Sequence, residues 1–136
     1  MNKFKLAVLA TCMVSGLGHA ATSCDGFEIK VKNALADDLL VTSLRLQGAE
    51  LQNKGFQKID SKTEQVFTVN KSAENVPITG EFVFHTISLP VKTVKINFDL
   101  TSKGLICQHD DKSPASDYSV GKLRLPGKVD YTISNK

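Results

Sequence analysis

Residues 92–100 carry the sequence Lys-Thr-Val-Lys-Ile-Asn-Phe-Asp-Leu, in which apolar and polar side chains alternate. Val94, Ile96, Phe98 and Leu100 share one parity, and the residues between them are polar or charged. Because successive side chains of a β-strand point to opposite faces of its sheet, this pattern is typical of a strand with one buried face. We therefore expect residues 92–100 to form a strand whose apolar side lies in the core.

The same period of two recurs along the chain. It is strict over residues 27–32 and 129–133, and it appears with aromatic side chains over 79–87. Further extended segments are expected at residues 39–46, 56–59, 64–69, 104–108, 118–120 and 122–125. No window of eleven residues has a convincing helical stripe, and turn signals recur about every 8 to 12 residues, which favours a sandwich or a closed barrel. The sequence predicts an all-β, single-domain antiparallel β-sandwich of about eight short strands, with Ile29, Val31, Phe82 and Phe84 also buried.

The first twenty residues predict export. Lys3 and Lys5 precede an uncharged stretch over residues 6–17, and Gly18-His19-Ala20 places small residues at a cleavage site. This is the pattern of a secretory signal peptide. The apolar stretch is about twelve residues long, whereas a membrane-spanning helix needs roughly 20. We expect a signal peptide over 1–20, a domain over 21–136, no integral membrane anchor, and a periplasmic or extracellular bacterial protein.

The cysteines fit the same compartment. Cys12 lies in the predicted signal, so Cys24 and Cys107 remain after cleavage. Two cysteines in an exported chain predict a disulfide. A metal or redox pair would need cysteines close in sequence or joined by histidines. Lipid attachment at Cys24 is the other alternative, but Ala21 and Ser23 do not match the residues that usually precede a lipidated cysteine.

The charge balance argues against a nucleic-acid partner. Of the 17 Lys and Arg side chains, Lys3 and Lys5 leave with the signal, so 15 remain against 14 Asp and Glu and the net charge is +1. Those cations are interleaved with acids, whereas phosphate binding needs basic residues gathered on one face or run.

Catalytic patterns are scarce in the mature chain. His85 lies in a predicted strand, on the face opposite Phe82 and Phe84, which is more typical of a surface or edge histidine than of a general base. His109, Asp110 and Asp111 form a small cluster that could hold a hard metal through its carboxylates. The cluster lacks the ligand spacing of a calcium loop and the additional His or Cys of a zinc site. We therefore predict no enzyme, metal or cofactor, and we place these three residues in a solvated loop over 109–116.

The order of features resembles a known group of small β-sandwich proteins. An alternating charged strand ends at Asn33, a second strand over 39–46 is followed by Gly48, and Thr79-Gly80-Glu81-Phe82 leads an aromatic strand before the regular one at 92–100. This order is similar to the aegerolysin and actinoporin-like proteins, whose members bind membrane lipids, some as parts of pores. The resemblance implies a β-sandwich fold and lipid binding.

The function expected first is a secreted or periplasmic binding module without enzymatic activity. Its ligand would be a protein, a glycan or a lipid, and it would bind surface loops because a rigid scaffold presents function on its loops. The loops are 70–77, with Asn70 and Asn75, and 109–116, with His109, Asp110 and Asp111. The alternatives are an aegerolysin-like lipid-binding or membrane-damaging protein, and a small hydrolase or metal-dependent enzyme.

Overall fold

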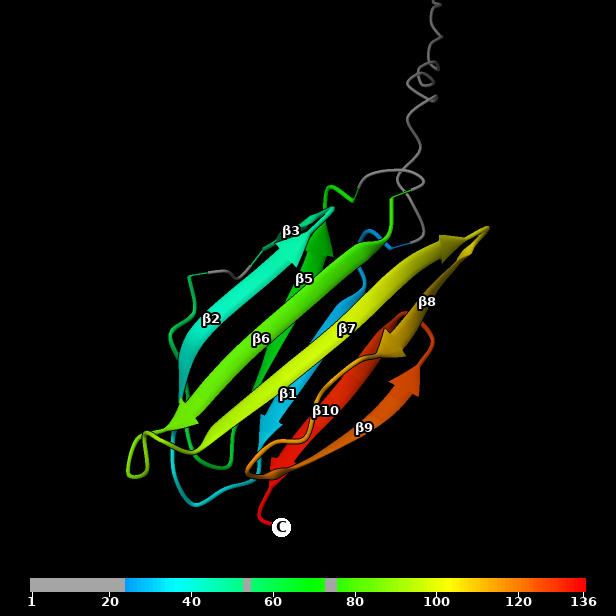
Figure 1. Ribbon diagram of the computed structural model, residues 1–136. Coiled ribbons are helices and arrows are strands. Elements are labelled where there is room, and N and C mark those ends of the chain that lie inside the picture. The colour runs from blue at the N-terminus through cyan, green and yellow to red at the C-terminus, as the bar shows by residue number, and fades with distance from the viewer. Residues whose placement is uncertain (1–23, 53–54, 73–75) are drawn as a thin grey trace, which may run out of the picture.

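The computed structural model describes residues 24–52, 55–72 and 76–136, which form two five-stranded β-sheets packed face to face (Figure 1). Sheet I has the spatial order β3 (Glu50–Leu51), β5 (Glu64–Asn70), β1 (Glu28–Asn33), β10 (Lys128–Ser134), β9 (Ser119–Leu125). Sheet II has the order β4 (Lys58–Ile59), β2 (Leu39–Gln47), β6 (Ile78–Thr86), β7 (Thr93–Lys103), β8 (Ile106–Asp111). No helix in this described part could cross a membrane. The predicted signal over 1–20 lies outside it.

The predicted all-β sandwich is confirmed, with three differences. There are ten strands rather than about eight: β3 was not expected, and β4 covers only two residues of the segment expected at 56–59. The segments expected at 118–120 and 122–125 form one strand, β9, since Gly121 continues the ladder opposite Thr132. The sheets are also not wholly antiparallel, because β1 and β10 pair in parallel. That pairing joins the two ends of the described chain, so no local turn signal could predict it.

The core contains the side chains that the alternation selected. Val94, Ile96, Phe98 and Leu100 are buried, as are Ile29, Val31, Phe82 and Phe84. Aromatic rings cross the core between the sheets. The ring centroids of Phe67 and Phe82 lie 5.0 Å apart, and those of Phe82 and Phe98 lie 5.4 Å apart, within the range of favourable aromatic pairs.

The predicted disulfide between Cys24 and Cys107 is confirmed. The two Cα atoms lie 4.8 Å apart, within bonding reach. Cys24 precedes β1 of sheet I and Cys107 lies in β8 of sheet II, so the bond ties the sheets together. We call this end of the sandwich, with the β7–β8 and β9–β10 turns beside it, the disulfide end.

The predicted loop over 109–116 is wrong in its first half. His109, Asp110 and Asp111 belong to β8 and pair with Leu100, Asp99 and Phe98 of β7. The side chains of β8 that turn inward are Cys107, His109 and Asp111, so the strand lacks the apolar face by which strands are recognised in a sequence.

Candidate functional site

The residues predicted for recognition do not form one site. Asn70 ends β5 and pairs with Glu50 of β3, at one edge of sheet I. The β8 residues lie at the opposite edge of the sandwich, beside β9 and β10. Asn75 lies outside the described residues. Of the predicted residues, only His109 and Asp111 join a shared group of polar side chains.

His109 is buried rather than solvated. Its residue is 5% exposed, and its ring stacks between Phe27 and Phe98, with centroid distances of 6.3 and 5.9 Å. Nε2 lies 2.8 Å from the hydroxyl of Tyr131, and Nδ1 accepts a hydrogen bond of 3.1 Å from Nε of Arg124. Both ring nitrogens are therefore engaged within the protein, and neither is offered to a substrate in this arrangement.

Asp111 extends this group toward the surface. Its Oδ1 accepts hydrogen bonds from the hydroxyls of Tyr131, at 3.1 Å, and Ser113, at 2.7 Å. Its Oδ2 lies 3.5 Å from Nζ of Lys122. We call Arg124, His109, Tyr131, Asp111 and Lys122 the seam cluster, because it joins β8, the last strand of sheet II, to β9 and β10 of sheet I.

Burial and charge set the protonation of the seam cluster. Burial lowers the pKa of His109, and the charge of Arg124 lowers it further, against the smaller opposing effects of Asp111 and Asp110. For Asp111, burial raises the pKa, but hydrogen bonds from Ser113 and Tyr131 and the charge of Lys122 outweigh it, so the net shift is downward. Burial raises the pKa of Tyr131 well above its ordinary value, and the charge of Asp111 adds to this. At neutral pH the cluster holds a neutral imidazole, a neutral phenol and an ionised carboxylate.

Sequence analysis missed three members of this cluster, namely Arg124, Tyr131 and Lys122. In β9 the side chains that share the inward side with Val120 are Lys122 and Arg124, opposite the buried Tyr131 and Val129. Leu123 and Leu125 instead face outward and are 58% and 36% exposed. From hydrophobicity alone, one would expect Leu123 and Leu125 to face the core and Lys122 and Arg124 to face solvent. The missed signal is the Lys122-Leu123-Arg124-Leu125 alternation. The partners of its two cations, His109 and Asp111, can be identified only once β8 is known to be a strand.

The second half of the predicted loop serves a structural purpose. Residues 112–117, which we call the strap, run along the first half of β7 and satisfy its backbone. Lys112 N donates to Asn97 O at 2.7 Å, and Asp117 N donates to Thr93 O at 3.2 Å. Side-chain oxygens of Ser113, Ser116 and Asp117 accept from the N–H groups of Asn97, Lys95 and Thr93, respectively. The strap is therefore committed to an otherwise open strand edge.

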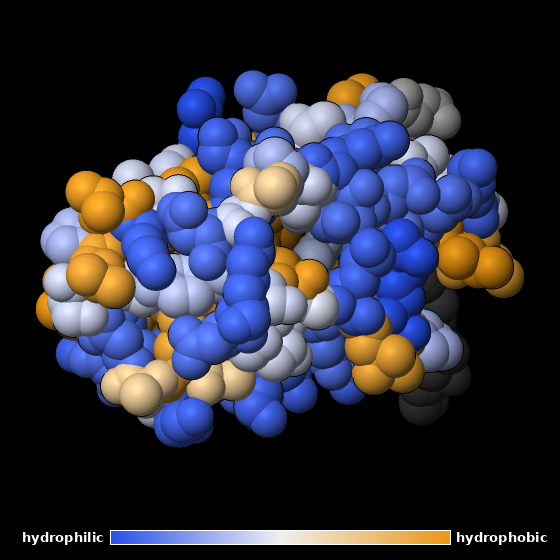
Figure 2. Space-filling model, turned by 60° about the horizontal axis from the view of Figure 1, so that its bottom comes forward, coloured by the Kyte–Doolittle hydropathy of each residue, from blue (hydrophilic) through white to orange (hydrophobic). Residues whose placement is uncertain are grey.

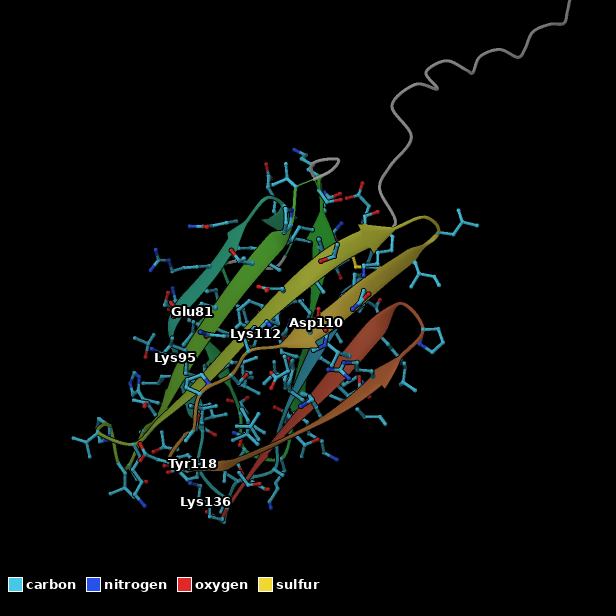
Figure 3. All side chains as sticks on the ribbon, turned by 45° about the vertical axis from the view of Figure 1, so that its right-hand side comes forward. Glu81, Lys95, Asp110, Lys112, Tyr118 and Lys136 are labelled. Carbon is cyan, nitrogen blue, oxygen red and sulfur yellow. A yellow bond between two sulfur atoms is a disulfide. The ribbon has the colours of Figure 1, made fainter. Side chains whose placement is uncertain are left out.

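Exposed apolar side chains lie on both hairpins of the disulfide end. In the β7–β8 hairpin Leu105 is 99% exposed and Ile106 is 67% exposed. The β9–β10 hairpin adds Leu123 and Leu125, and Figures 1 and 3 both show the two hairpin turns toward the same end of the sandwich, with the β7–β8 turn projecting farther. A separate apolar turn, with Val91 86% exposed, lies at the other end of β7. Figure 2 shows such residues as separate hydrophobic groups on a largely hydrophilic surface.

Two hollows lie along sheet II, one at its β2 edge and one on its outer face. One, of about 770 Å³, is lined by Leu40, Leu44, Phe56 and His85, where a bulge in β2 brings Thr42 Oγ1 2.7 Å from His85 Nδ1. The other, of about 310 Å³, is polar and contains Arg45, Glu81, Asn97 and Lys112. Figure 3 shows Glu81 beside Lys95 on this face, and these two side chains form an ion pair of 3.9 Å.

Neither hollow combines a nucleophile, a base and an orienting group. In the described part of the chain, moreover, no three metal-ligating side chains lie close enough to hold an ion. The chain matches no protein-family model, and no curated protein matches it. Function is therefore argued from this geometry alone.

Proposed function

We propose that this is an exported bacterial binding module without enzymatic activity, and that it binds its partner at the disulfide end. The observation that carries the proposal is that both hairpins of this end expose apolar side chains, Leu105 and Ile106 on one and Leu123 and Leu125 on the other. Single exposed apolar residues are ordinary, but Leu105 is almost fully exposed at 99% and its neighbour Ile106 at 67%, and exposed apolar surface of this kind favours an interaction site.

The hairpins are held in place before any partner binds. Cys107 lies two residues beyond Leu105 and is bonded to Cys24. On the other hairpin, Gly127 O accepts a hydrogen bond of 3.1 Å from Glu28 N at the start of β1. A surface fixed in advance loses little conformational entropy on binding, which favours affinity. The disulfide itself is consistent with an oxidising compartment such as the periplasm.

Of the two loops predicted for recognition, the described part of 70–77 lies at the proposed binding end and 109–116 does not. The connection after Asn70 leads to β6 at the disulfide end, where Val76 is 50% exposed. The segment 109–116 is excluded because it consists of β8 and the strap.

Site-specific photo-crosslinking in the producing bacterium tests this function. A photoreactive amino acid placed at Leu105 should give a covalent adduct with a partner molecule. The same group at Val91 is the matched control, because that side chain is apolar and exposed at the opposite end of β7. Equal adducts at both positions, or none at Leu105, would contradict the proposal.

Lipid binding is the second candidate function, and the cations at the disulfide end favour it. Lys103 and Lys128 flank the two hairpin turns, and no carboxylate of the described residues pairs with either. Apolar tips flanked by lysines suit the boundary between acyl chains and anionic headgroups. Lipid binding is also what the aegerolysin-like resemblance implies.

Liposome sedimentation separates the two candidates. Lipid binding predicts that the protein sediments with anionic vesicles, less with zwitterionic ones, and that Leu105→Ser reduces sedimentation while Val91→Ser does not. If the protein stays in the supernatant with both vesicles but still gives a protein adduct from position 105, its partner is a protein.

A further inference from the structure

We infer that the seam cluster is a pH-operated latch, in which protonation of His109 expels Arg124 and frees β9 from β8. The inference does not depend on the proposed function. It concerns a buried histidine whose contacts are complete in one protonation state only.

The direction of each hydrogen bond fixes that state. A guanidinium has only donors and keeps its proton in proteins, so Nδ1 of His109 must present a lone pair to Nε of Arg124. The ring proton is then on Nε2, which donates to the Tyr131 hydroxyl. That hydroxyl in turn donates to Oδ1 of Asp111. The chain of bonds runs in one direction, and a second ring proton has no acceptor at Nδ1.

Protonation of His109 would place its positive charge next to that of Arg124, and the two cations would repel each other. A proton on Nδ1 would face the N–H of Arg124 at a heavy-atom distance of 3.1 Å, beside a ring that is almost fully buried. Every other group that faces His109 can be named. Lys122 on β9 opposes the charge, Asp110 and Asp111 on β8 favour it, and Tyr131 on β10 is neutral. Phe27 and Phe98 cover the two ring faces and offer no charge.

Arg124 is the partner that must move. The His109 ring is held by its two aromatic neighbours and by Tyr131. Arg124 is an exposed residue, and the bond to His109 is the one hydrogen bond that its side chain makes among the described residues. The low pKa of His109 agrees with a closed state that resists the proton, so the latch opens only below the ordinary histidine range near pH 6.5.

Release of Arg124 leaves β9 weakly attached to sheet II. Six of the seven β9 residues are exposed, Val120 alone packs against the core, and among the described strands β9 pairs only with β10. Apart from Arg124, the described polar link from β9 to β8 is the contact of 3.5 Å between Lys122 and Asp111. Because β9 also carries Leu123 and Leu125, its release would change the shape of the disulfide end as well.

Nuclear magnetic resonance of the folded protein tests the latch through two signals. Titration of the His109 ring should give a pKa below 6.5, and Arg124→Met should raise it toward the ordinary value because the opposing cation and donor are gone. Arg45→Met is the matched control, since Arg45 pairs with Glu81 on the outer face of sheet II, outside the cluster. It should leave the His109 titration unchanged.

Hydrogen exchange measures the opening itself. Between pH 6.5 and the pKa of the closed state, the open fraction should rise about tenfold for each unit of acidification. After correction for intrinsic rates, exchange of the Arg124 Nε proton and of the β9 amides should accelerate accordingly, while the β1 amides should not. The latch is refuted if His109 titrates alike in wild type and Arg124→Met. It is also refuted if β9 exchange shows no dependence on pH beyond the intrinsic one.

Discussion

At the scale of single residues, packing against the rings of the core decides what each position tolerates. Gly80 shows this most directly. A Cβ atom at this position would lie 2.2 Å from Cζ of Phe98 and 2.6 Å from both Cε atoms, far inside van der Waals contact. Gly80 lies inside β6, where glycine is otherwise unfavourable. The sequence showed a glycine before an aromatic strand, but only the pairing of β6 with β7 explains why it is needed there.

Gly80→Ala should therefore destabilise the protein. The methyl group would push the buried Phe98 ring out of its position, and overpacking of this kind costs about 1–3 kcal/mol. Urea unfolding monitored by circular dichroism would measure the loss. Gly121→Ala is the matched control, because its nearest neighbour in the described structure is Thr132 O at 3.9 Å. An equal effect in the two variants would show that strand glycines matter for some other reason than the contact with Phe98.

His109 marks the limit of residue-scale prediction from sequence. Its neighbours along the chain, Asp110 and Asp111, suggested a solvated acidic loop. Its neighbours in space are two rings, a phenol and an arginine from four other parts of the chain. Burial of a polar group is favourable only when its hydrogen bonds are made, and those partners are not adjacent in sequence.

At the scale of elements, strands with regular hydrophobic alternation were placed correctly from the sequence, whereas a strand with a polar inward face was not. β1, β6 and β7 were expected within one to three residues of their ends, because each has an apolar side. β8 was shortened and displaced because its inward side chains are Cys107, His109 and Asp111. The strap was expected as a loop. It occupies the place of a neighbouring strand beside β7 through side-chain hydrogen bonds, and the period of the hydrophobic pattern carries no information about such bonds.

The outer edges of the sheets show why the strap matters. An unpaired strand edge invites association with other chains, and proteins cover, shorten or charge such edges. Here β3 and β4 are two residues long, β9 turns Lys122 and Arg124 inward, and the strap covers the first half of β7. Each of these edges has its own means of protection.

Removing two strap hydroxyls should uncover the β7 edge. In the double variant Ser113→Ala/Ser116→Ala, the N–H groups of Asn97 and Lys95 lose their acceptors, which should cost about 1 kcal/mol for each bond. Hydrogen exchange of these two amides should accelerate, while that of β6 stays slow. Ser119→Ala is the control, since no side-chain hydrogen bond is assigned to Ser119 among the described residues. Unchanged protection of both amides in the double variant would mean that the strap backbone alone covers this edge.

At the scale of the whole molecule, one covalent bond ties the two sheets together, and one parallel pairing within sheet I joins the two ends of the described chain. The disulfide joins residues that are 83 positions apart, and β1 pairs with β10 from the other end of the chain. The bond was predictable because only two cysteines remain after the expected cleavage. The pairing was not, because parallel neighbours are joined by no turn.

Loss of the disulfide should lower stability strongly. In the chain-entropy model, a crosslink across a loop of this length contributes roughly 4–5 kcal/mol. The double variant Cys24→Ala/Cys107→Ala should therefore melt more than about 10 °C below the wild type in calorimetry. A reductant should bring the wild type down to the variant and leave the variant unchanged. If a reductant, added under conditions that unfold the protein, left the melting temperature of the wild type unchanged, that result would show that the bond does not form.

The disulfide also bears on how the N-terminus is processed during export, because it uses the sulfur that a lipid would need. If the signal is cleaved after Ala20, the exported chain begins at Ala21 and keeps 116 of its 136 residues. The Cys24 sulfur is then bonded to Cys107 and cannot also carry a thioether-linked lipid. The intact mass of the purified protein should therefore equal that of residues 21–136 less two hydrogens. A mass that retains residues 1–20 would contradict cleavage, and an added diacylglycerol mass with a free thiol at Cys107 would contradict the disulfide as well.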